Sequence, residues 1–121
     1  MKLTRSFTYA WQGIRYCFKT QLNFRIHLTA LLIVIGAGCI FKISNTEWLF
    51  IIGCSMLVLA LELLNTAIEH LCDMVTKSIH PEIKIIKDVS ADAVLLSAIG
   101  SVVTGCIIFF PKILELLKTQ Q

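Results

Sequence analysis

Four polar side chains gather at the end of an apolar run, in the stretch LALELLNTAIEHLCDMV, residues 59–75. An α-helix turns by about 100° per residue, so all four lie on one face about 80° wide and about 16 Å long. Carboxylates on such a face suit proton transfer and binding of a divalent cation. The four residues are Glu62, Asn65, Glu69 and Asp73.

The two glutamates are predicted to do different work. Glu62 follows the almost wholly apolar, uncharged residues 48–61, and a carboxylate within a membrane costs about 3 kcal/mol, which makes it functional by default. The deeper Glu62 suits a general base that takes a proton from a hydroxyl. Glu69 suits Mg²⁺, which takes one or two carboxylates plus substrate phosphates, and Asn65 between them can orient either. The alternative is that Glu69 and Asp73 are simply solvated at the helix end.

A second polar group precedes the last apolar segment. Lys87 and Asp88 are adjacent there, and a lysine beside a metal-bound polyphosphate recurs in phosphoryl transfer. His80 is close in sequence and could donate to phosphate. A cytoplasmic lysine of a membrane protein, however, needs no further purpose. The chain has no P-loop, kinase-type glycine-rich loop or HEXXH sequence, so ATP would require an unconventional site.

The composition is that of a membrane protein. Mean hydropathy is +0.78 and 16% of the 121 residues are charged, against about 25% in soluble domains. We predict one all-α domain, residues 1–121, with transmembrane helices at about 27–43, 48–68 and 91–110. The five scattered cysteines are expected to behave as small hydrophobes, and we expect no nucleic-acid partner.

The segments that flank the predicted spans are polar or amphipathic. Residues 6–22 predict a helix in the membrane interface, with aromatic and apolar side chains on one side and cations on the other; packing against the other helices is the alternative. Residues 76–90 predict a loop in which Pro81 interrupts any helix. The distribution of Lys and Arg places the N-terminus and this loop in the cytoplasm, and no cleavable signal peptide is predicted.

Three stretches carry a resemblance to a known family: YAWQGIRYCFKTQLNFRIH, ELLNTAIEHLCD and KDVSADAVL. In this order and spacing the chain resembles the small bacterial integral-membrane diacylglycerol kinase and undecaprenol kinase family, roughly from residue 7 to residue 111. The resemblance implies a homotrimer with three spans and an N-terminal surface helix in the bacterial cytoplasmic membrane. It also implies active sites between subunits that use MgATP to phosphorylate a lipid hydroxyl, on diacylglycerol or undecaprenol.

The resemblance also implies roles by position. Glu62 is the implied catalytic base and Glu69 the implied metal and ATP ligand, with Asn65 and Asp73 in a supporting polar network. The implied ATP contacts are Tyr9, Gln21, His80, Lys87 and Asp88. The implied lipid contacts are Trp11, Arg15, Asn23 and Arg25.

Gln21 departs from the family pattern, because the better-known diacylglycerol kinases have a glutamate there. A glutamine can coordinate Mg²⁺ through its carbonyl oxygen but brings no charge, so we expect weaker metal binding. Asp92 stands where a small residue is usual, and nothing in the sequence explains it. Two other functions stay open: an oligomeric proton or ion pathway on the Glu62 and Glu69 face, and a catalytically inactive scaffold.

Overall fold

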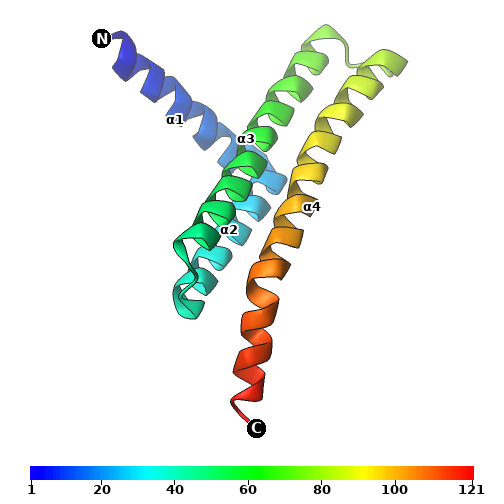
Figure 1. The fold of residues 1–121 in the computed structure, drawn as a ribbon. Coiled ribbons are helices and arrows are strands. Elements are labelled where there is room, and N and C mark those ends of the chain that lie inside the picture. Colours follow the sequence, from blue (N-terminus) through cyan, green and yellow to red (C-terminus); the bar gives the residue numbers. More distant parts are fainter.

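The computed structural model describes all 121 residues as four helices without a strand (Figure 1). They are α1 (Lys2–Thr20), α2 (Leu22–Phe41), α3 (Asn45–Val75) and α4 (Pro81–Lys118). Helix α3 lies beside both α2 and α4, whereas α1 runs outward at an angle (Figure 1). Gln21 separates α1 from α2 because its backbone is extended, with φ −109° and ψ 110°. The all-α prediction is confirmed.

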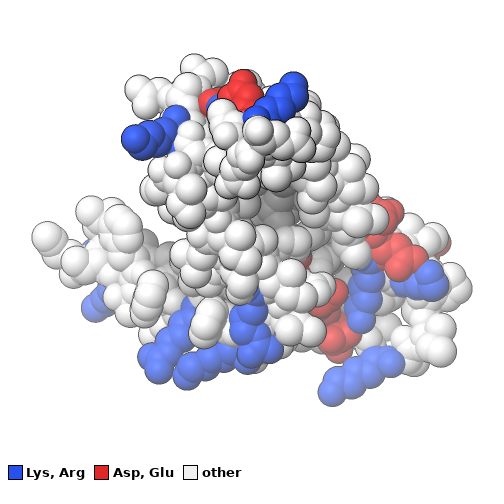
Figure 2. All heavy atoms as spheres, turned by 90° about the horizontal axis from the view of Figure 1, so that it is seen from below, with Lys and Arg blue, Asp and Glu red and all other residues white.

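The surface of the three long helices is apolar, as expected for helices in lipid. Each of α2, α3 and α4 is long and apolar enough to cross a membrane. Large side chains such as Ile33 and Leu96 are 67% and 73% exposed, whereas Glu62 and Asn65 are buried. Figure 2 shows Lys and Arg in groups around the edge of the view and uncharged atoms over the middle. The burial pattern is therefore partly inverted relative to a water-soluble protein.

The predicted loop over residues 76–90 is wrong beyond His80, because α4 begins at Pro81. A proline is tolerated at the first helical position, where its missing N–H would have no helical partner. His80 caps this helix, since its Nδ1 accepts a hydrogen bond from the Glu82 backbone N–H at 3.2 Å. Pro81 thus starts a helix instead of interrupting one, and Lys87 and Asp88 lie on α4.

The other ends of the helices are joined by an apolar cluster. Buried Ile43, Ile51 and Ile108 form its centre, with Trp48 among the side chains packed against it. Gly38 allows this packing, because a Cβ there would lie 2.7 Å from the Trp48 ring. This cluster lies away from Glu62, at the end of the helices opposite the connection between α3 and α4.

A capping box begins α3. The Ser44 hydroxyl accepts from the Glu47 N–H at 3.2 Å, and the Glu47 carboxylate accepts from the Ser44 N–H at 3.0 Å. Lys112 Nζ of α4 lies 3.3 Å from the same carboxylate. The start of α3 is therefore tied to α4 as well as to its own backbone.

We expect Ser44→Ala to lower the free energy of unfolding by about 1 kcal/mol, because the Glu47 N–H loses its acceptor. Unfolding of the purified protein in detergent, followed by loss of helical circular dichroism, measures the change. Thr46→Ala is the matched control, because it removes a neighbouring exposed hydroxyl outside the capping box. Equal stability of the two variants would contradict the assignment.

Candidate active site

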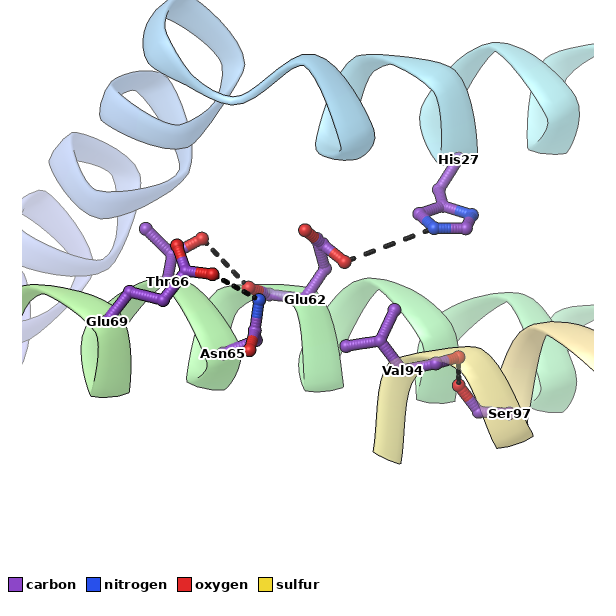
Figure 3. A network of polar contacts seen from close by, with 7 residues as sticks. All are labelled: His27, Glu62, Asn65, Thr66, Glu69, Val94 and Ser97. Atoms are coloured by element: carbon purple, nitrogen blue, oxygen red, sulfur yellow. Dashed lines mark hydrogen bonds and ion pairs between the residues drawn. The ribbon is translucent and has the colours of Figure 1, made fainter. Parts of the chain in front are cut away.

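Glu62 lies among α2, α3 and α4 and is only 2% exposed. Its partner is on α2, where His27 Nε2 lies 4.0 Å from Glu62 Oε2. Figure 3 shows the two side chains pointing toward each other, with Val94 and Ser97 of α4 nearby. A buried carboxylate facing an imidazole is an arrangement suited to accepting a proton.

Asn65 and Glu69 form the next part of the site, toward the C-terminal end of α3. Asn65 Nδ2 donates to Glu69 Oε1 at 3.3 Å, while Asn65 Oδ1 is buried without a hydrogen-bond partner. Thr66 donates to the Glu62 carbonyl at 3.0 Å (Figure 3). The face therefore offers a carboxylate and an unpaired carbonyl oxygen side by side, although no group of three His, Cys, Asp or Glu side chains is assembled for a metal.

Two ion pairs lie close to the connection between α3 and α4, one joining the two helices and one within α4. Lys87 Nζ donates to Asp73 Oδ1 at 2.7 Å, and Lys84 pairs with Asp88. The hydrogen bond from Lys87 lowers the pKa of Asp73 below its ordinary 3.8, and the bond to Asp73 raises the pKa of Lys87 above 10.5. Lys87 is thereby held near the C-terminal end of the acidic face.

These directions predict how the Asp73–Lys87 pair responds to pH. Because the pKa of Asp73 is lower in the folded state, this group stabilises the fold fully above the unfolded-state pKa of 3.8. That stabilisation is lost as the pH falls through the folded-state pKa. Because the pKa of Lys87 is higher in the folded state, this group stabilises the fold fully below the unfolded-state pKa of 10.5. That stabilisation is lost as the pH rises through the folded-state pKa.

We therefore expect the difference in melting temperature between the native chain and Asp73→Asn to be constant between about pH 5 and about pH 9. The difference should shrink in stronger acid. Thermal unfolding across this range measures it. Asp92→Asn serves as the control, since Asp92 forms no ion pair. A difference that already changes steadily across that interval would contradict the pairing.

The remaining predicted site residues do not meet the acidic face within one protomer. Tyr9, Trp11 and Arg15 are exposed on the outward-running α1, and Asn23 and Arg25 are exposed on α2. Gln21 donates through Nε2 to Thr20 Oγ1 at 3.4 Å rather than contacting Glu69. The groups brought together are Glu62, Asn65 and Glu69 on α3, and Asp73 with Lys87.

Sequence reasoning missed His27 and the pair formed by Tyr16 and His70. Tyr16 Oη lies 3.0 Å from His70 Nε2, so this pair joins α1 to α3. A signal for His27 was available, because a buried acid in a membrane segment normally has a partner. His27 is the only basic residue between Arg25 and Lys42, and a search for such a partner would have selected it.

An apolar groove of about 630 Å³ lies between α1 and α3. Tyr16 and His70 line it together with Thr66, whose hydroxyl contacts the Glu62 backbone. Most of its other walls are apolar, including Ile14 and Leu63. Its size and chemistry suit an acyl or isoprenoid chain lying beside the acidic face.

The sequence comparisons identify the family. The family described as Prokaryotic diacylglycerol kinase matches residues 8–109. The chain belongs to this family. It is therefore grouped with multi-pass membrane lipid kinases of the diacylglycerol and undecaprenol kinase type, in agreement with its three long apolar helices.

The similar proteins include some named diacylglycerol kinase and one named undecaprenol kinase. The chain is 43% identical to a diacylglycerol kinase of Synechocystis sp. over 93% of its own length and 65% of that protein. It is 39% identical to an undecaprenol kinase of Bacillus subtilis over 90% of its length and 89% of that protein. It is 28% identical to a diacylglycerol kinase of Escherichia coli over 90% of its length and 89% of that protein. The chain thus spans slightly less than two thirds of the Synechocystis relative and most of the other two.

Proposed function

We propose that this protein transfers the γ-phosphoryl group of ATP to the terminal hydroxyl of a membrane lipid, either diacylglycerol or undecaprenol. The observation that carries the proposal is the burial of Glu62 at the end of an apolar stretch of α3, about one turn from Asn65 and two turns from Glu69. Membership of the prokaryotic diacylglycerol kinase family supports it. The groove beside α3 supports a lipid as the acceptor.

In this mechanism Glu62 is the general base. It takes the proton of the lipid hydroxyl while the oxygen attacks the γ-phosphorus in line. A new P–O bond forms, the bond to the bridging oxygen breaks, and its electron pair leaves with ADP. Lys87, held by Asp73, neutralises charge on the phosphates, and Asn65 orients Glu69. Positioning and electrostatics supply most of the acceleration.

The donor set at Glu69 fits Mg²⁺. The ion prefers oxygen ligands and uses one or two carboxylates together with substrate phosphates. Glu69 supplies a carboxylate, and the unpaired, buried Asn65 Oδ1 beside it lacks a partner that a cation would provide. When bound, Mg²⁺ would neutralise the phosphate oxygens and orient the polyphosphate. Gln21 is a further candidate ligand, through its carbonyl oxygen.

We also propose that the working unit is a homotrimer in the bacterial cytoplasmic membrane, with the N-terminus in the cytoplasm. Within one protomer, Tyr9, Gln21 and His80 do not reach the acidic face, and exposed apolar side chains cover α2 and α4. A neighbouring subunit could supply protein around that face. Cross-linking in native membranes would measure the number of subunits.

The test is an assay of purified protein with labelled ATP, Mg²⁺, and diacylglycerol and undecaprenol in parallel. We expect label in an extractable lipid product, and the ratio of the two rates identifies the substrate. Absence of labelling with every lipid would overturn the kinase proposal. Nucleotide-independent conductance in planar bilayers would instead support an ion pathway.

A further inference from the structure

His27 occupies a special position on α2, where it is the only basic residue between Arg25 and Lys42. Its Nε2 lies 4.0 Å from Glu62 Oε2, and the two side chains are 24% and 3% exposed. Figure 3 shows the imidazole facing the carboxylate across the space between α2 and α3. Two titratable side chains from different helices therefore meet where water access is restricted.

Glu62 has one ion-pair partner in the structure, the imidazole of His27. The other glutamate of the acidic face, Glu69, accepts a hydrogen bond from Asn65. Figure 3 also draws Val94 and Ser97 of α4, which are uncharged. The imidazole is therefore the polar group that α2 brings to the Glu62 carboxylate.

A cavity adjoins His27. It has a volume of about 260 Å³, lies between α2, α3 and α4, and is lined by His27, Cys54, Ser55 and Ser101 among other residues. This space gives the imidazole room to rotate, and although most of its walls are apolar, Ser55 and Ser101 place hydroxyl groups among them. The separation of 4.0 Å exceeds a direct hydrogen bond of about 2.7–3.2 Å, but catalytic hydrogen bonds are often long until substrate binds.

We propose that His27 is a positioning residue for Glu62: its Nε2–H holds Oε2 and so presents Oε1 to the lipid hydroxyl. This inference rests on the proposed kinase function. During transfer the hydroxyl proton moves to Glu62 Oε1, while the His27 N–H continues to hold Oε2.

The experiment compares His27→Leu, His27→Gln and Cys54→Ala in the same lipid kinase assay. His27→Leu removes the ring N–H donor, His27→Gln keeps a side-chain N–H donor, and Cys54→Ala alters the same cavity without touching Glu62. The values of kcat and of KM for ATP are measured for each variant. Thermal unfolding reports whether each variant folds.

We expect kcat of His27→Leu to fall about 10- to 100-fold with KM for ATP unchanged. His27→Gln should recover part of kcat, because its side-chain N–H can still hold Oε2. Cys54→Ala should match the native chain in both respects.

Two results would overturn the inference while leaving the kinase proposal intact: His27 variants as active as Cys54→Ala, or a folded His27→Gln that recovers none of the kcat lost in His27→Leu. If His27→Leu does not fold, the kcat of His27→Gln relative to Cys54→Ala decides the question. An inactive native chain would instead overturn the kinase proposal itself. The two failures are therefore distinguishable.

Discussion

Replacing Glu62 by glutamine should reduce lipid phosphorylation by about 10²- to 10⁴-fold, the range associated with loss of a general base. The amide keeps the size of the side chain but cannot accept the hydroxyl proton as a carboxylate does. Because Glu62 is 2% exposed, bulk water is poorly placed to replace it. The effect should appear in kcat, measured with saturating lipid and MgATP, while nucleotide binding persists.

Glu115→Gln is the matched control for the Glu62 prediction. Glu115 is an exposed carboxylate near the end of α4, so its replacement changes net charge equally without touching the acidic face. It should retain native activity. Near-native kcat in Glu62→Gln would remove Glu62 from the role of base, even if the protein proved to be a lipid kinase.

Replacing Glu69 by glutamine should lower kcat/KM for MgATP by about 10²- to 10³-fold, a loss typical of one electrostatic contact to the reacting group. The amide lacks the negative charge that the Glu69 carboxylate, held by the Asn65 Nδ2 hydrogen bond, would bring to the ion. The Mg²⁺ concentration needed for half-maximal activity should rise, which a Mg²⁺ titration at fixed ATP measures. This response separates a ligand from a solvated carboxylate at the helix end.

Glu82→Gln provides the control for Glu69, since Glu82 is exposed in the first turn of α4. Gln21→Glu tests the opposite change, because a carboxylate restored before α2 should lower the Mg²⁺ requirement if residue 21 reaches the metal. An unaltered Mg²⁺ requirement in Glu69→Gln would contradict its role as a ligand. Activity that appears only in Gln21→Glu would indicate that the native chain is an inactive scaffold.

Local sequence was sufficient to predict four helices and the apolar character of the three long ones. The pattern around Trp48 and Glu62 shows why: a long apolar run places a carboxylate on a helix that continues for more than three turns, and helical geometry then places Asn65 and Glu69 on the same face. The start of α4 was harder to predict. A proline ends one helix or begins another, and that choice depends on whether the residue before it can cap the new helix, as His80 does here.

By itself, then, the sequence determined the membrane class, the helices and the acidic face, because each depends on neighbours within a few turns of one chain. The tertiary structure decided which side chains pair between helices. Only the packing of α2 against α3 brings His27 to Glu62, and only the short connection between α3 and α4 brings Lys87 to Asp73. Side-chain separations between helices depend on crossing angle and register, which the period of a single helix does not encode.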